Sequence, residues 1–305
     1  MSERSEIKIF CIYHGSVELP IFATDCIQPI QSGSAINGAR KGAWRDDIGD
    51  NISNKNPVWA ELCVHYWVLK NWLMQNPQAS HVGFCHYRRH LNFRAAPISR
   101  FAIVRKLFSH ALLFEDQKRF SARFHKAYTQ SAVSRYILGY DVILPGKSYL
   151  KQSVIAQYAS AGHSLEDIDK LTAIVRRRYP DYSDDMDAFL NGNTAYLWLN
   201  FVMRREWLIE FLEWEFDILT ELERESDWAR GARQDSYALA RIPAFLAERF
   251  FNVWLMHKLR VDGGRLLERQ GLMLVDDGRG FFGINVEKAW QMVKVFIASA
   301  WRKDA

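Results

Sequence analysis

The chain has 305 residues, of which 49% are hydrophobic and 25% charged, so it can bury a large core and does not belong to the disordered class. Its net charge of +5 is mild. Such a charge fits anionic partners, namely nucleotide-sugars, nucleic acid or acidic lipid headgroups, or it has no functional meaning. Aromatic residues are frequent at 14%, with 11 Trp, which is typical of clefts that bind sugars or bases and of membrane-surface proteins.

The first half of the chain predicts two buried strands separated by a loop and a helix. IKIFCIY at residues 7–13 is an apolar, β-branched run. Residues 24–56 are rich in Gly, Asn, Ser and Asp and predict a long irregular loop. Pro57 suits the first turn of the expected helix NPVWAELCVHYWVLKNWL. HVGFCHY at residues 81–87 predicts the second buried strand.

The rest of the chain predicts mostly helices, with short strands between them. We expect strands over residues 139–145, 194–203 and 271–283, helices over 101–136, 149–178, 204–225 and 240–259, and a polar loop over 182–193. Strands alternating with helices favour an α/β fold with a mainly parallel sheet. We predict a single domain, residues 1–283. Residues 284–305 predict an amphipathic helix that suits an anionic membrane surface or docking on the core.

The cysteines and the N-terminus indicate the cytoplasm. The four cysteines form no CxxC pair and have no zinc-like spacing, so we expect reduced core residues. The stretch MSERSEIKIF lacks the apolar segment of a signal peptide. No run approaches the roughly 18 apolar residues of a membrane-spanning helix.

The stretch CHYRRH, residues 85–90, puts anion-binding groups directly after the second predicted strand. Ligands of parallel α/β sheets bind beyond the carboxyl ends of the strands. Arg88 and Arg89 can each grip a phosphate with a planar guanidinium, His86 can donate a hydrogen bond, and Tyr87 can stack on a base or sugar. The motif suits a pyrophosphate. The alternative is an arginine pair bound to loop carboxylates.

Two segments offer carboxylates for a general base. The loop DDIGDNISNKN, residues 46–56, carries Asp47 and Asp50, which could bind a divalent metal, accept a proton or hold ribose hydroxyls, or could only form turns. Glu248 lies among apolar residues in FLAERFF. A carboxyl group in such surroundings can have a raised pKa that suits a base, and pairing with a neighbouring arginine is the alternative.

Other cofactor signatures are weak. The sequence has no GxGxxG, and PGKS at residues 145–148 lacks the first Gly of a phosphate loop. Asp-x-Asp occurs at residues 167–169 and 185–187, but neither pair directly follows an apolar strand. The basic run RRRYP motivates an alternative reading, a non-catalytic module that binds nucleic acid or membrane.

Five segments in order resemble one known family. They are IFCIYH, GDNISNKNPVWAELCVHYWVLKN, VGFCHYRRHL, YDVILP and LAERFFNVWL, which together span roughly residues 7–257. The chain resembles the bacterial capsular and exopolysaccharide glycosyltransferases that long carried only an unknown-function label. Some members are similar to β-galactofuranosyltransferases of O-antigen assembly. The resemblance implies a GT-A-like fold in which a mainly parallel central sheet is flanked by helices, with helical C-terminal additions.

The resemblance also implies roles for particular residues. It places donor-diphosphate contacts at the four residues of HYRR, where other GT-A enzymes have Asp-x-Asp. The further residues that match family motifs are His14, Asp47, Asp50, Asn51, Lys55 and Glu61. Asn200 in LNFVM lies one place out of register with the family pattern, so the resemblance assigns it no role.

We therefore predict an inverting hexosyltransferase of surface-polysaccharide synthesis. Its donor is a nucleotide-sugar, UDP-linked and with galactofuranose as the family-level candidate, and its acceptor is a polysaccharide or a lipid-linked oligosaccharide. Asp47, Asp50 and Glu248 are the candidate bases. Mn²⁺ or Mg²⁺ is a possible cofactor, and we assign no metal ligands. We expect no nucleic-acid partner, and a cytoplasmic location that includes peripheral contact with the inner face of the membrane. A nucleotidyl- or phosphotransferase that needs bound metal is a further alternative.

Overall fold

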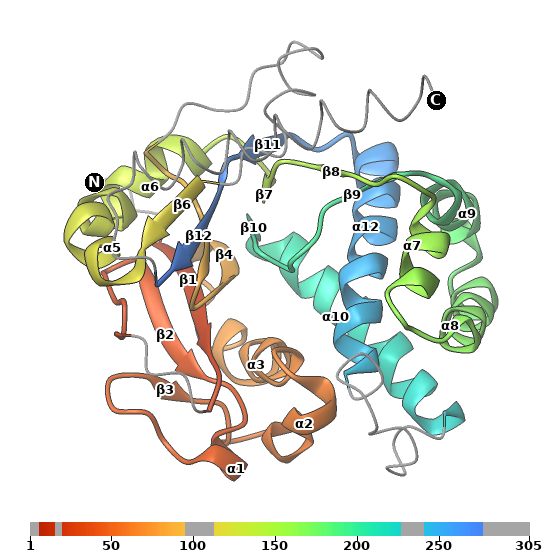
Figure 1. The fold of residues 1–305 in the computed structure, drawn as a ribbon, viewed down its shortest axis with the longest axis horizontal. Helices are drawn as coiled ribbons and strands as arrows, with labels where there is room; N and C mark the ends of the chain where they lie inside the picture. Colours follow the sequence, from red (N-terminus) through yellow and green to blue (C-terminus); the bar gives the residue numbers. More distant parts are fainter. Residues whose placement is uncertain (1–5, 16–19, 95–112, 227–240, 277–305) are drawn as a thin grey trace, which may run out of the picture.

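A computed structural model describes residues 6–15, 20–94, 113–226 and 241–276, which form a mixed sheet with helices on both faces (Figure 1). The strands of the main path are, in spatial order, β11 (Leu266–Arg269), β7 (Val142–Pro145), β10 (Phe201–Arg204), β4 (Ala79–His86), β1 (Glu6–Tyr13), β2 (Ile27–Gln31) and β3 (Trp44–Arg45). β1 is parallel to β2 and β4, whereas β10 is antiparallel to β4 and β7. The predicted α/β class with a mainly parallel sheet flanked by helices is confirmed.

A second group of strands extends the sheet from β4. β4 turns into β5 (Arg89–Leu91), which pairs with β12 (Gly271–Val275), and β12 pairs with β6 (Leu113–Asp116). β8 (Ser148–Tyr149) and β9 (Thr194–Ala195) form a separate two-stranded sheet.

The helices divide the core into two parts because strand side chains alternate between the faces of the sheet. Phe10 and Phe84 face the larger part, and Cys11 and Cys85 face the smaller part. Helices that cover the larger part are α3 (Leu62–Trp67), α7 (Val154–Ser160), α8 (Leu165–Arg178), α9 (Ser183–Asn191), α10 (Arg205–Glu225) and α12 (Ile242–Asp262). The smaller part lies under α5 (Gln117–Phe124) and α6 (Gln130–Ile137).

The segment predicted as one long loop, residues 24–56, is more regular than expected. It contains β2, the short helix α1 (Ser34–Asn37) and β3. β2 was not predicted from the sequence because it contains Pro29, and proline cannot donate a backbone hydrogen bond to a neighbouring strand. The structure tolerates it because β3 pairs only with Ile30 and Gln31.

The helix predicted from Pro57 is interrupted. α2 (Asn56–Trp59) ends where Ala60 adopts a positive φ of 47°. The Asn56 side chain donates to the Ala60 carbonyl at 2.9 Å and to Ser32 Oγ at 2.8 Å, and so ties the break to the end of β2. α3 then begins at Leu62 and continues as a π-helical turn over Val68–Leu73.

Three other boundaries differ from the predictions. The predicted polar loop over residues 182–193 is largely α9, whose buried Met186 and Phe189 pack inward and whose first-turn acids suit the helix dipole. The predicted strand 194–203 is split into β9 and β10. The predicted helix 101–136 begins with strand β6 in its described part. The predicted helix 284–305 lies outside the described residues.

None of the described helices is long and apolar enough to cross a bilayer.

Candidate active site

A tight hairpin presents the CHYRRH motif. β4 and β5 are antiparallel, with His86 opposite Arg89, so Tyr87 and Arg88 form a two-residue turn. The Tyr87 backbone N–H donates to the Ile12 carbonyl at 2.9 Å, which aligns the turn with the end of β1. The strand end predicted from sequence is therefore also a chain reversal, and it lies beside the carboxyl end of β1.

Two histidines meet at these strand ends. Nε2 of His14 and Nε2 of His86 are 2.7 Å apart, so one ring donates a hydrogen bond and the other accepts it. Burial lowers the pKa of His86 well below its usual value, and His14, Arg89 and Arg88 lower it further. Burial also lowers the pKa of His14, where Glu61 opposes the effect and Arg241 and Arg88 add to it. Both rings are therefore neutral at pH 7, and the arginines carry the positive charge.

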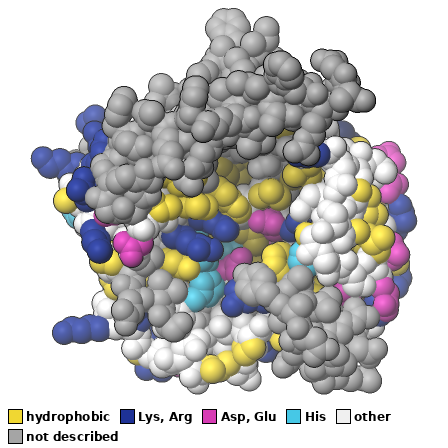
Figure 2. All heavy atoms as spheres, in the orientation of Figure 1, with side chains coloured by type: hydrophobic (Ala, Val, Ile, Leu, Met, Phe, Trp, Pro, Cys, Tyr) yellow, Lys and Arg dark blue, Asp and Glu magenta, His cyan; other side chains and the backbone are white. Residues whose placement is uncertain are grey.

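The two arginines of the hairpin differ in their surroundings. Arg88 is exposed, with its guanidinium carbon 5.7 Å from the centre of the Tyr87 ring. Arg89 is half-buried, and its guanidinium carbon lies 4.9 Å from the centre of the Trp198 ring. Figure 2 shows a central hollow on this face of the molecule, in which basic, histidine and acidic side chains gather between the strand ends and α12.

A strained segment supports the hairpin from the α12 side. Trp198 has φ 81° and Leu199 has φ 26°, which is unfavourable for residues with a Cβ and costs about 1–3 kcal/mol each. α12 holds this segment with two side chains that lie one turn apart. Glu248 accepts from the Trp198 backbone N–H, and Asn252 bonds both the N–H and the carbonyl of Tyr196. α12 thus maintains the strained backbone next to Arg89.

A cleft opens on the other side of Tyr87. It is lined mainly by Tyr13, Ile21, Phe22, Tyr87 and Phe120, and its volume of about 20 Å³ has room for one water molecule. A ring could therefore enter this cleft only if its aromatic side chains move apart. Tyr87 therefore stands between an aromatic cleft and the histidine pair, its ring centre 4.5 Å from that of His86.

The acidic loop is organised by a buried residue rather than by its exposed ones. Asp46 is fully buried and accepts from the backbone N–H groups of Gly33 and Ser34 and from Ser53 Oγ, at 2.6–2.8 Å. Asp47 forms a two-point ion pair with Arg45, which holds the pKa of Asp47 below its usual value.

Three other predicted residues of this segment have contacts outside the hairpin. Asp50 accepts from the Tyr66 hydroxyl at 3.1 Å, and Asn51 bonds Gly49 and Ser53 within its own turn. Lys55 donates to Glu223 of α10 at 2.7 Å. The structure therefore brings His14 and the HYRR residues together, with Glu61 near enough to affect the pKa of His14. Asp47, Asp50, Asn51 and Lys55 have other neighbours. Their proposed roles remain predictions.

The remaining charged motifs are engaged in ion pairs. Asp185 accepts from Arg260 at 2.8 Å and lies 3.0 Å from His257, which together hold its pKa below its usual value against the effect of burial. The RRRYP arginines pair with acids of α9 and α10, namely Arg176 with Asp187, Arg177 with Glu221 and Glu225, and Arg178 with Asp217 and Glu221. The basic run that suggested nucleic-acid binding is therefore matched by acidic partners.

Sequence reasoning missed Trp198 and Asn252, which support the hairpin. Asn252 lies in the family segment LAERFFNVWL, four residues after Glu248, and this helical spacing is the signal that could have paired the two. No local sequence pattern identifies Trp198, because its position depends on the break between β9 and β10, which divides the predicted strand.

The fold and these motifs place the chain in a known class. It belongs to the family described as "Domain of unknown function (DUF4422)", whose model matches residues 8–259. It is also similar to the apo structure of WbbM, a bifunctional glycosyltransferase, with a TM-score of 0.71 and 29% sequence identity. This match covers 88% of the chain and 45% of the WbbM chain, so the chain spans less than half of that protein. A search of curated proteins gives no match. The family resemblance inferred from the motifs is confirmed.

Proposed function

We propose that the protein is a glycosyltransferase that transfers a hexosyl group from a nucleotide-sugar to a polysaccharide or lipid-linked acceptor of the bacterial surface. The observation that carries the proposal is the cluster of His14, His86, Arg88 and Arg89 at the adjoining ends of β1 and β4. The similarity to WbbM supports the reaction class. A UDP-linked donor and galactofuranose are the specific candidates.

The cluster suits a departing diphosphate. In the proposed single displacement an acceptor hydroxyl attacks the anomeric carbon, the bond to the diphosphate oxygen breaks, and configuration inverts. Negative charge grows on the leaving oxygen, where Arg88 and Arg89 supply positive charge and the histidine pair supplies a hydrogen-bond donor. Fixed donors of this kind, aimed at developing charge, lower the barrier in a site that excludes water.

We place the nucleobase at the aromatic cleft beside Tyr87, whose side chains would have to open around it. Tyr87 borders both the cleft and the histidine pair, so a nucleotide could place its ring among the aromatic side chains and its phosphates against the arginines. Stacking on such side chains contributes roughly 1–3 kcal/mol per base.

Glu248 is our candidate for the general base. Of the three predicted bases, Glu248 has described contacts that reach the hairpin, because it accepts from the backbone N–H of Trp198, whose ring packs against Arg89. A carboxylate has about four lone-pair positions, so accepting from Trp198 and Arg249 leaves capacity for an acceptor hydroxyl. Replacement by Gln keeps the acceptor for the Trp198 N–H and removes the basicity.

The donor set at the strand ends does not fit a divalent cation. The hairpin offers two guanidinium groups and no carboxylate of its own, whereas Mn²⁺ and Mg²⁺ prefer oxygen ligands, and the guanidinium charges repel a metal ion. We therefore propose that arginine charge takes the place of Mn²⁺ or Mg²⁺ here. Activity that disappears with EDTA and returns with Mn²⁺ would contradict this part of the proposal.

A thermal-shift screen with turnover tests the function. Purified protein is heated with UDP, GDP, CMP or dTDP, with and without Mn²⁺, and nucleotide release from UDP-sugars is measured. A ligand that binds only the folded state raises the melting temperature. We expect UDP to do so without metal, and Glu248→Gln to lose turnover while keeping the UDP shift. If Glu248→Gln loses the UDP-induced rise in melting temperature, the turnover and the stability of the fold to the same extent, Glu248 has a positioning role instead. If no nucleotide shifts the melting temperature, the proposal fails.

A lipid-linked acceptor would bring the protein to the inner face of the cytoplasmic membrane. This peripheral contact is part of the proposal, and co-sedimentation with vesicles that contain anionic lipid tests it. Binding that is indifferent to anionic lipid would count against it.

A further inference from the structure

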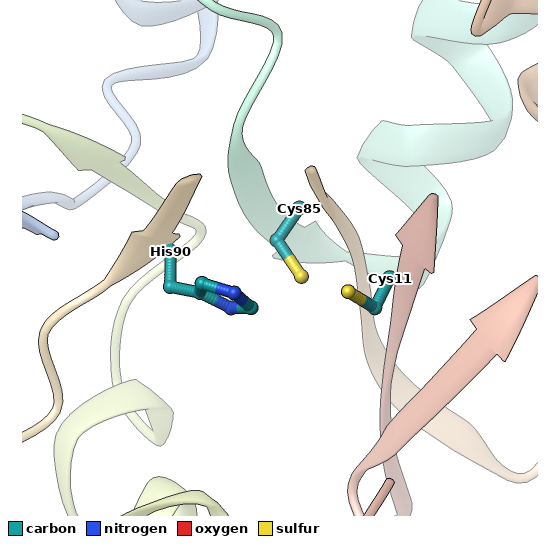
Figure 3. Close-up of side chains that lie close together, drawn as sticks. All are labelled: Cys11, Cys85 and His90. Carbon is teal, nitrogen blue, oxygen red and sulfur yellow. The ribbon is translucent and has the colours of Figure 1, made fainter. Parts of the chain in front are cut away.

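Three metal-binding side chains converge beneath the hairpin, on the face of the sheet that points away from α12. Cys11 of β1 and Cys85 of β4 are direct partners in the parallel register. His90 follows in β5. Figure 3 shows the two thiols directed toward one another, with the His90 ring beside them. One ligand atom from each residue lies within 4.8 Å of the other two, and all three residues are buried.

Two buried polar side chains at this place lack well-formed hydrogen bonds to the residues that the structure describes. His90 is 1% exposed, and its ring nitrogens have the Tyr87 backbone near them but no partner at good hydrogen-bond geometry. Asn200 is 2% exposed, and both polar atoms of its side chain are also without a partner among the described residues. Asn200, His90 and Cys85 line the same small cavity. Unpaired buried polar groups destabilise a folded protein, so their presence at this place requires an explanation.

The types of the four side chains indicate which kind of metal ion they would bind. Two thiolates balance the charge of a divalent cation, whereas the imidazole and the amide oxygen are neutral donors. His90 is fully buried beside the two thiols, and the neutral imidazole is the form of histidine that binds metal ions. The complex would carry no net charge, which removes the main cost of burying an ion in an apolar core.

We propose that Cys11, Cys85 and His90 bind a thiophilic divalent cation of the zinc type, with the Asn200 amide oxygen as the fourth donor. Binding releases the two thiol protons to solvent as two sulfur–metal bonds form. Zinc–sulfur bonds of about 2.3 Å in a tetrahedral site place the sulfur atoms about 3.8 Å apart. The observed separations within 4.8 Å therefore close with movements of about 1 Å or less.

The position of this site gives it a structural consequence. Cys85 and His90 flank the HYRR residues on both sides, and Cys11 fixes them to β1. A bound cation would clamp the base of the hairpin that carries Arg88 and Arg89. The inference concerns the metal site alone and does not depend on the reaction proposed for the hairpin.

Titration of the reduced, chelator-treated full-length protein with Co²⁺ and Zn²⁺ tests the site. We expect one ion per chain, thiolate-to-cobalt charge-transfer absorption, intense visible bands of tetrahedral Co²⁺ that Zn²⁺ abolishes, and release of protons. Zn²⁺ should also raise the melting temperature. The spectrum of the wild type suffices to test the proposal even where a variant folds poorly.

Matched variants complete the test. Cys85→Ser should lose the absorption bands and the zinc-dependent shift. Cys63→Ser is the control, because Cys63 is equally buried but faces the other part of the core and donates to the Ile52 carbonyl. The inference is overturned if wild type shows no charge-transfer band, if Cys85→Ser and Cys63→Ser behave alike, or if mass spectrometry of the untreated protein shows a Cys11–Cys85 disulfide with two hydrogens lost and no metal.

Discussion

Replacing Asp46 should destabilise the protein far more than replacing its neighbour Asp47. Asp46 is completely buried and accepts from three groups, the Gly33 and Ser34 backbone N–H groups and the Ser53 hydroxyl. A hydrogen bond to a charged group contributes about 1.5–3 kcal/mol, and the bonds are not fully additive. Asp46→Ala should therefore lower the free energy of unfolding by about 4 kcal/mol, and Asp46→Asn, which keeps one acceptor, by about 2 kcal/mol.

Asp47→Ala is the matched control. Its carboxylate forms one exposed ion pair with Arg45, and such pairs contribute roughly 0–1 kcal/mol. Urea unfolding of the three variants, followed by tryptophan fluorescence, measures the differences. Equal midpoints for Asp46→Ala and Asp47→Ala would refute the view that the buried carboxylate holds the loop against the strand ends.

Two further predictions concern the core. Burial raises the pKa of Glu215, against the effect of the nearby His65. Glu215 therefore contributes its full stabilisation below the pKa of about 4.3 that it has in the unfolded chain, and this contribution is lost as the pH rises through its pKa in the folded protein. Glu215→Gln should therefore melt higher than wild type at pH 8, with a difference that vanishes near pH 4; a difference independent of pH would contradict this. Gly83→Ala would place its Cβ 2.1 Å from the Phe201 carbonyl oxygen, which forces β4 and β10 apart. We expect a loss of about 3 kcal/mol or more in urea unfolding, and a wild-type midpoint would show that the strands are not so closely apposed.

The elements that sequence reasoning found are those whose signals are local. β1, β4 and β7 are short apolar runs, and α10 and α12 show long helical periodicity. β2 was missed because Pro29 and its polar neighbours resemble a loop. α9 was missed because it contains several Asp residues and ends at Asn191, residue types that favour turns, and because its apolar residues are few.

The site could be predicted only in part for the same reason. The composition of HYRR indicated an anion site, but the contact between His14 and His86 depends on the register of β1 with β4. Partners distant in sequence could not be inferred, as with Lys55 and Glu223, which are 168 residues apart. The cysteine and histidine cluster also escaped detection, because zinc spacing is sought along one segment and these ligands come from three strands.

We propose above that the hairpin arginines bind the diphosphate of a nucleotide-sugar donor. Isothermal titration with UDP and UMP tests it most directly, because the two ligands differ by one phosphate. We expect wild type and the control Arg135→Ala, an exposed arginine of α6, to bind UDP at least ~10-fold more tightly than UMP. In Arg88→Ala this preference should largely disappear while UMP binding is retained. An unchanged UDP-to-UMP ratio in Arg88→Ala, or no binding of either nucleotide to wild type, would contradict the account.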